Sequence, residues 1–376
     1  MIVPFVDLKT QYQNIKPEID LAIQGVLDSA AFIMGPKVKE FEEGFARLHE
    51  AAYCIGTSSG TDSLHLALWA AGIQPGDKVI VPVNTFIATA EAVSLCGAEP
   101  VFIDCDDYYN LDVSKLRQKL SAMSAKERTR LRGIIPVHLY GQPADMDEIM
   151  ALAKEYNLLL VEDCAQAHCA RFNGQPVGTL GLVGCFSFYP GKNLGAYGEA
   201  GAVITNDRRL YEAMRLIHDH GAPVRYQHDV VGHNYRMEGI QGAVLAVKLN
   251  YISTWTRMRQ ENANLYSQWL QDVAEVTVPR IKSGRTHSFH LYVIRVKERD
   301  ALMKYLADHG ISTGLHYPVP LHLQKAYAHL GYQRGDFPVA EKMAKEILSL
   351  PMYPELTEEQ IRFVVDQIKN FFASRR

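Results

Sequence analysis

One lysine, Lys192, stands in a glycine-rich stretch that carries no other positive charge, SFYPGKNLGAYGEAGAVIT (residues 187–205). A lysine among glycines has two common chemical uses. Its amine can hold a phosphate group, or it can form a covalent bond to a carbonyl carbon. The surrounding glycines give the backbone the conformational freedom that either use requires.

The residues around Lys192 do not match the known phosphate-binding patterns. A P-loop has a glycine five residues before its Gly-Lys pair and a Ser or Thr directly after it. Here Phe186 and Asn193 occupy those two positions. The glycines that follow are three residues apart, so they do not form the dinucleotide pattern GxGxxG either. Covalent chemistry is therefore the better prediction, and a solvated loop lysine is the alternative that this segment alone leaves open.

A carboxylate, Asp163, ends the apolar run NLLLVED (residues 157–163). Open α/β sheets bind their ligands at the carboxyl ends of the strands, and a buried carboxylate there needs a cationic or hydrogen-bonding partner. The pyridinium nitrogen of pyridoxal 5′-phosphate (PLP) is such a partner, and pairing with it keeps the ring an electron sink. Gln166 could reach the same ligand. The alternative for Asp163 is a cap on the next helix.

Two further segments fit such a cofactor. In GTSSGTDSLHLALWAAG (residues 56–72), Gly60 and Thr61 precede a helix that is expected to begin at about Asp62. Small hydroxyl residues and a glycine at a helix N-terminus form an anion site, or else an ordinary helix cap. Phe86 follows another strand end, where it could stack on a flat ring or belong to the core.

The elements that must position these residues alternate between strands and helices. This alternation predicts an α/β fold with a mainly parallel sheet between helices. The last two strand runs have no helix between them, which predicts a hairpin or a sheet switch around Lys192. The expected strands are 52–56, 78–83, 100–104, 133–139, 157–163, 184–189 and 201–205, and the expected helices are 15–29, 62–71, 87–96, 113–120 and 146–156.

The pattern changes after residue 250, and the chain is expected to form a large domain (residues 1–250) and a smaller C-terminal α+β domain (residues 251–376). A long polar helix over 251–273 opens the second part. A strand within 287–296 and helices over 300–309 and 358–373 follow it.

Composition narrows the class of protein. The chain of 376 residues is 47% hydrophobic and 22% charged, as soluble globular proteins are, and its net charge of −3 gives no sign of a nucleic-acid surface. The N-terminus MIVPFVDLKTQYQ does not resemble a signal peptide, and no apolar run is long enough to span a membrane. The six cysteines form no CxxC pair, and most lie in or beside apolar strand-like segments, where they are expected to be small buried residues in a reducing cytoplasm.

The order of these segments is the layout of fold-type I PLP enzymes: a phosphate loop, an aromatic residue, an Asp at a strand end, and a Lys about thirty residues later. Over essentially its whole length the chain resembles the DegT/DnrJ/StrS sugar aminotransferase family. The resemblance rests on these stretches: FVDLKTQYQNIKPEI, FIMGPKVKEFEEGFA, SSGTDSLHLAL, VNTFIAT, VHLYGQPADM, EDCAQAH, SFYPGKNLGAYGEAGAVIT, HNYRMEGIQGAVLAVKL and HYPVPLHLQ.

The resemblance implies a role for each matching residue. Lys192 would bind the cofactor covalently and carry the proton between cofactor and substrate carbons, and Asp163 would hold the pyridine nitrogen. Gln166 would lie near the ring hydroxyl. Phosphate binding would fall to Gly60, Thr61 and Ser187, and ring stacking to Phe86. Asn234 would reach the phosphate from a neighbouring subunit, which implies a homodimer with shared active sites.

The implied reaction moves the amine of an amino acid, expected to be L-glutamate, through PLP to the ketone of a dTDP-linked keto-6-deoxyhexose. Gly191 stands just before Lys192 where many members of the family have a threonine, and this PGKN form is associated with the branch that aminates at C3. The product would enter a surface polysaccharide such as an O-antigen, or a glycosylated metabolite. No metal is expected. The residues expected to line the substrate site are Tyr189, Arg236, His316, Tyr317 and His322, with core or interface roles as the alternative for the histidines and the arginine.

Several alternatives to this function stay open. The enzyme could aminate C4, or it could be an ordinary amino-acid aminotransferase. A relative with histidine in place of the lysine would dehydrate sugars, but Lys192 argues against that. From another class of protein, a PLP-binding regulator could keep the fold without turnover. Two small departures from the family pattern, Cys169 and Ala200 in place of glycines, are expected to affect only local packing.

Overall fold

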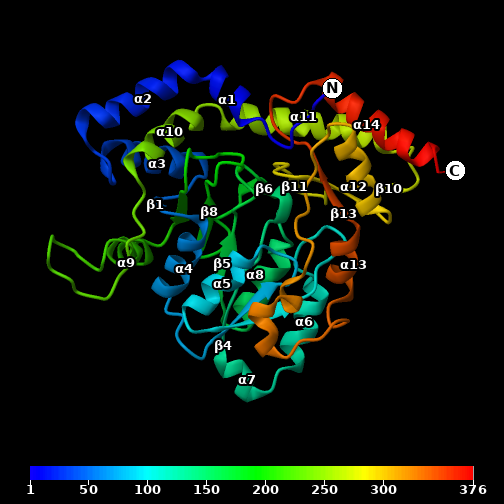
Figure 1. Cartoon of the computed structure of the whole chain (residues 1–376). Helices are drawn as coiled ribbons and strands as arrows, with labels where there is room; N and C mark the ends of the chain where they lie inside the picture. The colour runs from blue at the N-terminus through cyan, green and yellow to red at the C-terminus, as the bar shows by residue number, and fades with distance from the viewer. Residues whose placement is uncertain (376) are drawn as a thin grey trace.

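The computed structural model describes residues 1–375, and its centre is a seven-stranded sheet in the order β1-β9-β8-β5-β4-β2-β3 (Figure 1). All neighbouring pairs are parallel except the two that involve β9, which runs antiparallel to both β1 and β8. The strands are β1 (Tyr53–Thr57), β2 (Lys78–Pro82), β3 (Glu99–Ile103), β4 (Leu131–Ile134), β5 (Leu159–Asp163), β8 (Val183–Ser187) and β9 (Gly201–Thr205). The predicted α/β fold is confirmed, and so is the hairpin, because β8 and β9 pair directly around Lys192.

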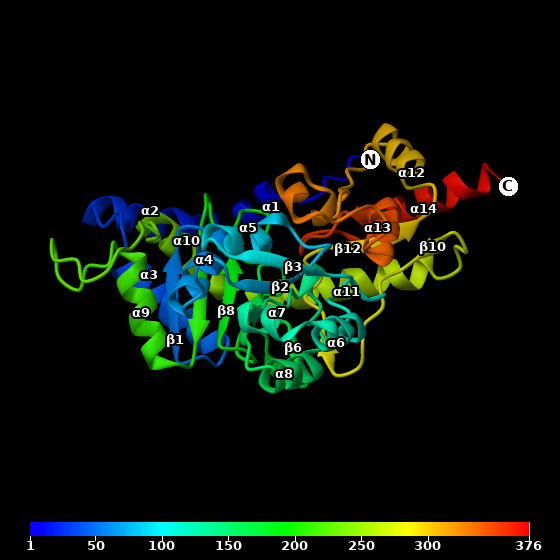
Figure 2. The ribbon, with the colours of Figure 1, turned by 90° about the horizontal axis from the view of Figure 1, so that it is seen from below.

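Both faces of the sheet are covered by helices, and alternate side chains of each strand enter different cores. On β2, Val79 and Val81 pack into one apolar cluster, whereas Ile80 between them packs into another. This alternation follows from the two-residue period of a strand. Figure 2 shows the sheet between the two layers of helices. The helices are α4 (Gly60–Ala70), α5 (Ile87–Leu95) and α9 (Arg208–His218) on one face, and α3 (Gly35–Leu48), α10 (Gly239–Leu249), α6 (Val113–Ala122) and α8 (Met146–Glu155) on the other.

Helices α3, α9 and α10 are absent from the sequence prediction, and α10 shows why. It contains Gly239 and Gly242, and glycine is a poor helix former. The glycine is needed because α10 crosses α3 closely: a Cβ on Gly242 would lie 2.7 Å from a side-chain atom of Val38. The remaining helices of this part are α1 (Leu8–Asn14), α2 (Lys16–Ser29) and α7 (Ala125–Arg130).

The C-terminal part forms a second, smaller sheet with its own core. Strands β10 (Val276–Thr277), β12 (Tyr292–Val296) and β13 (Ile347–Leu350) pair antiparallel, and α11 (Ile252–Leu270), α12 (Arg299–Asp308) and α14 (Glu358–Ala373) pack on them. Helix α13 (Pro338–Glu346) and residues such as Leu291 belong instead to the core of the large sheet. The division after residue 250 therefore stays a prediction. A third, small sheet joins β6 (Arg171–Phe172), β7 (Gln175–Pro176) and β11 (Arg285–Thr286).

The cysteines are free, and Cys54, Cys105, Cys164 and Cys185 are buried, as the sequence predicted. Among residues 1–375, the helices lack the combination of length and apolar character that a membrane crossing requires.

The departure from the family pattern at Cys169 has a physical consequence, because its φ is +61°. A side chain in this left-handed region costs about 1–2 kcal/mol relative to glycine. We expect Cys169→Gly to raise the free energy of unfolding by about 1 kcal/mol, which urea denaturation would measure. The same change at Cys164, which is buried and has no positive φ, should instead lower stability. A less stable Cys169→Gly protein would contradict the expectation.

Candidate active site

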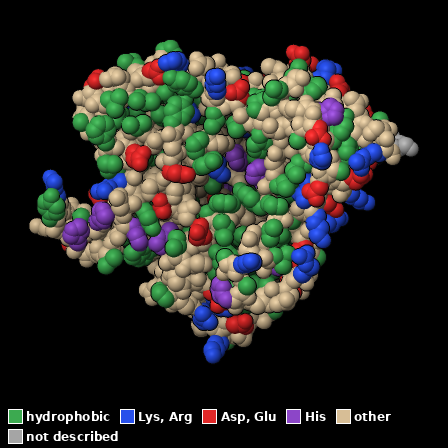
Figure 3. Space-filling model, viewed as in Figure 1, with side chains coloured by type: hydrophobic (Ala, Val, Ile, Leu, Met, Phe, Trp, Pro, Cys, Tyr) green, Lys and Arg blue, Asp and Glu red, His purple; other side chains and the backbone are tan. Residues whose placement is uncertain are grey.

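A cavity of about 530 Å³ opens at the carboxyl ends of the central strands, where Figure 3 shows the surface hollowed with histidine side chains at the hollow. The fold thus brings together ten of the thirteen residues that the sequence singled out. The ten are Gly60, Thr61, Phe86, Asp163, Gln166, Ser187, Tyr189, Lys192, His316 and Tyr317.

Lys192 lies in the tight connection between β8 and β9. Its own N–H donates to the carbonyl of Tyr189 at 2.8 Å, and the N–H of Ala196 donates to the carbonyl of Phe188 at 2.7 Å. These bonds fold the connection back on itself, so that the lysine side chain enters the cavity. Burial lowers the pKa of Lys192 to about 8, against the opposing effect of the Asp163 charge. About a tenth of the amine is therefore neutral at pH 7, far more than for an ordinary lysine, and both covalent chemistry and proton transfer require the neutral form.

The lowered pKa of Lys192 predicts a pH dependence of stability. Between the folded pKa of about 8 and the ordinary value of 10.5, the unfolded chain binds more protons at this residue than the folded protein does. The free energy of unfolding should therefore rise with pH in this window, by at most about 1.4 kcal/mol per pH unit. We expect ligand-free Lys192→Met to show a smaller rise than the wild type in urea unfolding across this window. Equal rises would contradict the expectation.

Asp163 ends β5 and turns a buried carboxylate into the cavity. One of its oxygens accepts a hydrogen bond from the Thr89 hydroxyl at 2.8 Å, and the other accepts one from the Ala165 N–H at 3.1 Å. Burial raises the pKa of Asp163 above its ordinary value. A positively charged N–H donor in the cavity would offset the cost of burying the ionised carboxylate. This is the partner that a pyridinium nitrogen provides.

The N-terminus of α4 provides donors for an anion. The helix begins at Gly60, slightly earlier than predicted, and the Ser59 hydroxyl caps it by accepting from the N–H of Asp62 at 3.0 Å. The N–H groups of Gly60 and Thr61 have no partner within the helix, because the first helical bond comes from Ser63. A Cβ on Gly60 would lie 2.5 Å from the Cβ of Ser187. Only glycine therefore lets these donors and the Ser187 hydroxyl converge, and they fit a phosphate.

The Gln166 side chain is fixed by hydrogen bonds at both ends. Its Oε1 accepts from the backbone N–H of Tyr140 at 2.7 Å, and its Nε2 donates to the hydroxyl of Tyr317 at 3.1 Å. The Tyr317 ring lies 5.3 Å from the ring of Phe86, centroid to centroid. Gln166 and two aromatic rings thus stand next to one another in the cavity wall.

The other three predicted residues lie outside this cavity. Arg236 forms an ion pair with Asp219 at 2.9 Å and donates to the side-chain oxygen of Asn234 at 3.0 Å. His322 is buried against Glu341, with 3.0 Å between Nε2 and the carboxylate, so the structure gives it the core role rather than a place at the substrate. Asn234 was expected to contact the cofactor phosphate in a neighbouring subunit, and the structure of one chain does not test that expectation.

Several residues of the cavity were not predicted. Thr89 lies two residues after the expected start of α5, and its hydroxyl in the first turn of a mainly apolar helix is the one local signal that could have identified it. His290 lines the cavity from the C-terminal part, and Phe5 and Val6 line it from the N-terminal segment. Their contribution depends on tertiary contacts, such as the parallel bridge between Val3 and Ile311.

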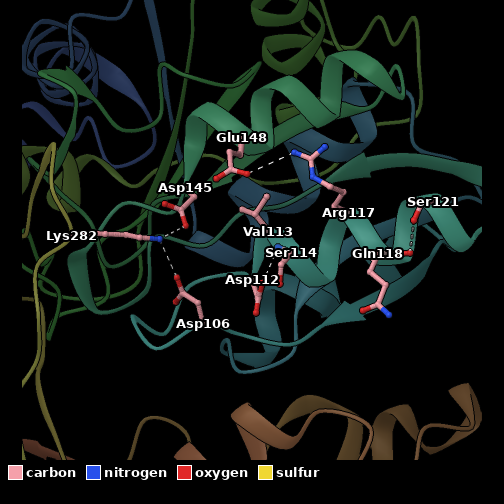
Figure 4. Close-up of a pocket in the computed structure, with 10 residues that line it drawn as sticks. All are labelled: Asp106, Asp112, Val113, Ser114, Arg117, Gln118, Ser121, Asp145, Glu148 and Lys282. Carbon is pink, nitrogen blue, oxygen red and sulfur yellow. Dashed lines mark hydrogen bonds and ion pairs between the residues drawn. The ribbon is translucent and has the colours of Figure 1, made fainter.

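A second pocket, of about 560 Å³, lies apart from Lys192 and is lined by paired charges (Figure 4). Lys282 lies between Asp145 and Asp106, with 3.6 Å to the latter. Arg117 on α6 faces Glu148 on α8 at 3.7 Å. The Lys282 pairs join the segment before β11 to the part of the chain that forms the large sheet, and the Arg117 pair joins α6 to α8, so we assign these ion pairs a structural role.

One group of side chains in the described residues has the proximity that a metal site needs: His138, Glu162 and Cys164. The Nδ1 of His138 accepts from the Ala144 N–H at 3.0 Å, so its Nε2 carries the proton and donates to Glu162 at 2.9 Å. Glu162 also accepts from three backbone N–H groups of the segment 178–181. Because these groups already satisfy one another, we assign no metal to them.

The chain is similar to known proteins over nearly its whole length. The chain is 45% identical, over 99% of both chains, to a Geobacillus stearothermophilus protein named pleiotropic regulatory protein. It is 40% identical to the dTDP-3-amino-3,4,6-trideoxy-alpha-D-glucose transaminase of Streptomyces venezuelae, over 98% of this chain and 96% of the relative. The solved structure of S. venezuelae DesV in complex with a ketimine intermediate has a TM-score of 0.94 and 41% identity, and the match covers 98% of both chains.

Other relatives act on different nucleotide sugars. Two relatives, 42% and 39% identical to this chain, are named as aminotransferases of UDP-linked 3-keto sugars. A third, 34% identical, is named GDP-perosamine synthase. The solved NtdA of Bacillus subtilis, at 29% identity, carries the cofactor PMP, so the predicted type of cofactor is confirmed for the family. The pattern of the DegT/DnrJ/EryC1/StrS aminotransferase family matches residues 13–369. This chain therefore belongs to the DegT/DnrJ/EryC1/StrS aminotransferase family.

Proposed function

We propose that this protein is a PLP-dependent aminotransferase that moves the amine of L-glutamate onto C3 of a dTDP-linked keto-6-deoxyhexose. The observation that carries the proposal is the single cavity in which the Lys192 amine, the buried Asp163 carboxylate and the free N–H groups at the start of α4 converge. PLP, when bound, supplies the electron sink for the chemistry at the substrate carbon.

Each residue of the cavity would have a separate role around that cofactor. Asp163 would keep the ring nitrogen protonated, Gln166 would fix the ring plane, and the N–H groups of Gly60 and Thr61 with the Ser187 hydroxyl would hold the phosphate. Lys192 Nζ would hold the cofactor's carbonyl carbon and then carry a proton between substrate and cofactor carbons. Its pKa of about 8 suits both tasks, because the amine exchanges its proton readily near neutral pH.

Charge in the cavity favours a 6-deoxy sugar over a uronate. Lys192 is the only Lys or Arg among the residues that line it. Burial also lowers the pKa of His316 to about 4 and that of His290 well below its ordinary value, so both are neutral. Within the lining that this chain provides, the catalytic amine alone would pair with a carboxylate at C6, whereas Phe5, Phe86 and Tyr317 offer apolar surface to a methyl group. The preference for dTDP and for C3 rests on the relatives.

The same scarcity of positive charge supports a homodimer, which we place in the cytoplasm. A cofactor phosphate, a glutamate and a sugar nucleotide are all anionic, and this chain gives them one amine and uncharged donors. Further donors would come from a second copy, through the segment that holds Asn234 and Arg236. An apolar area around α2 and α3 (Figure 3), with Leu21, Leu27 and Phe32 exposed, fits such a contact.

The test is to reconstitute the purified protein with PLP, add L-glutamate, and follow 2-oxoglutarate with dTDP-, UDP- and GDP-linked 3-keto and 4-keto sugars in parallel. We expect turnover with a dTDP-linked 3-keto-6-deoxyhexose, and an aminated product at C3 by NMR. Turnover only with a UDP- or GDP-linked sugar, or only with a 4-keto sugar, would keep the reaction class and overturn the substrate. No release of 2-oxoglutarate with any sugar would overturn the glutamate reaction.

A second candidate function is regulation, because the relative at 45% identity is named a regulatory protein. A regulator would bind PLP through Lys192 and show no turnover with any of these sugars. The complete set of Asp163, Gln166, Ser187 and Lys192 in one cavity favours the enzyme.

A further inference from the structure

Two buried basic side chains, Lys248 on α10 and Arg259 on α11, contact segments of the active site and have no carboxylate partner within ion-pair distance. Lys248 is 0% exposed and Arg259 is 2% exposed. Among residues 1–375, neither lies within ion-pair distance of an acidic side chain. Their nearest opposite charge is that of Glu355, which acts on both from a distance and has one buried carboxylate oxygen with no hydrogen-bond partner.

Lys248 contacts the Lys192 loop, which is the connection between β8 and β9, directly. Its Nζ donates to the carbonyl of Gly195 at 2.7 Å, three residues after Lys192. The same amine lies 4.3 Å from the centre of the Tyr197 ring, in the same loop, as a cation–π contact. One side chain therefore contacts the loop at two residues, both of them far from Lys248 in sequence.

Arg259 holds the opposite side of the same loop through an intermediate segment. Its Nη1 donates to three carbonyls, those of Phe289 at 3.2 Å, His290 at 3.4 Å and Met352 at 2.9 Å. The segment with Phe289 and His290 is in turn bonded to Asn193, the neighbour of Lys192. Asn193 donates to the carbonyl of Ser288 at 2.9 Å, and its oxygen lies 3.3 Å from Nδ1 of His290.

Stability alone does not account for these two cations. Burying a charge costs free energy, and apolar residues of similar volume often replace buried ions with no loss of stability. Both side chains donate hydrogen bonds to backbone carbonyls in segments that flank Lys192 or line its cavity. Arg299 offers the contrast: it is 8% exposed, forms an ion pair with Asp300 at 2.5 Å, and donates to the carbonyls of Ala344 and Ile347, neither of which lines the cavity.

We propose that Lys248 and Arg259 are positioning residues that brace the Lys192 loop from its two sides and keep the Lys192 amine enclosed and reactive. The proposal concerns the lysine of the proposed function but needs neither turnover nor a bound cofactor. If the contacts of either residue are lost, we expect water to enter the loop. The pKa of Lys192 should then rise, because burial is what lowers it.

The test uses ligand-free full-length protein and the rate of reductive methylation of Lys192, read by peptide mass spectrometry as a function of pH. Lys248→Met and Arg259→Met should raise the pKa of Lys192 by about one unit, which at pH 8 lowers the neutral fraction, and the labelling rate, about five-fold. Arg299→Met, the control for loss of a buried arginine away from the cavity, should leave the profile unchanged. Lys248→Gln keeps a donor for Gly195 and should keep most of the wild-type rate.

The outcomes separate the proposal from general destabilisation. It is overturned if Lys248→Met and Arg259→Met fold and label Lys192 as the wild type does, or if Arg299→Met shifts the profile equally. It is also overturned if Lys248→Gln behaves as Lys248→Met, because the hydrogen bond would then not matter. Should a methionine variant not fold, Lys248→Gln and Asn193→Ala carry the test, and a wild-type profile in Asn193→Ala overturns the Arg259 side. A failure of glutamate turnover would leave these results unaffected.

Discussion

Lys192→Ala should abolish the reaction, with a loss of at least about 10³-fold in the amino-transfer rate. The amine both binds the cofactor's carbonyl carbon and carries the proton, and no other primary amine lines the cavity. The visible absorption band of lysine-bound PLP should be absent from the variant, whereas the wild type should show that band and lose it on addition of glutamate. Spectra of the two reconstituted proteins and a coupled assay for 2-oxoglutarate would measure both effects.

The matched control is Lys39→Ala, a change at a lysine whose side chain is 76% exposed on α3, and it should leave spectrum and rate unchanged. Retention of the visible band in Lys192→Ala would contradict the assignment of Lys192. A band in the wild type that glutamate does not alter would keep the lysine and reject glutamate as the donor.

Asp163→Asn should produce the second largest effect, a loss of about 10²–10³-fold in rate with a smaller change in PLP affinity. Asparagine has nearly the same shape and can keep the bonds to Thr89 and Ala165, but it lacks the charge that holds the ring nitrogen protonated. The cofactor would then be a weaker electron sink, so the proton-transfer step should slow. Single-turnover kinetics with glutamate, which separate chemistry from binding, would measure this.

The same substitution should have the opposite effect on the ligand-free protein. Burial raises the pKa of Asp163, so its ionisation destabilises the folded state as the pH rises above the ordinary value of 3.8. Asp163→Asn removes that cost, and ligand-free Asp163→Asn should be the more stable protein in urea at neutral pH. If the substitution instead lowered stability at neutral pH and left the rate unchanged, Asp163 would be only a structural hydrogen-bond acceptor. Thr89→Val, which removes one of its donors, serves as the control for hydrogen bonding without charge.

The central fold could be predicted from the sequence because its signals are local. Apolar runs such as 157–163 and 201–205 have the length and composition of buried strands, and the absence of a helix between the last two runs predicted the β8–β9 hairpin. The helices with poor local signals were not found. Helix α10 contains glycines that its crossing with α3 requires, and a close crossing leaves no local pattern.

The chemistry of the cavity could also be predicted in part, because each residue follows a strand end or precedes a helix. Gly60 and Thr61, Phe86, Asp163 and Lys192 all have such positions, and the carboxyl ends of neighbouring strands meet at one edge. His322 could not be placed, since nothing near it in sequence reveals that Glu341 lies beside it in the core.

By itself, the sequence determined the types of the reacting groups and the order in which the chain presents them. Only the tertiary structure decided which hydrogen-bond partners these groups have and how far burial shifts their pKa values. Thr89 meets Asp163 across 74 residues of chain, and Lys248 meets Gly195 across 53. The pKa of about 8 at Lys192 comes from burial by segments that fold over it. The physical reason is that hydrophobic periodicity acts within a few residues, whereas desolvation and hydrogen bonding depend on whichever groups the packed fold brings into contact.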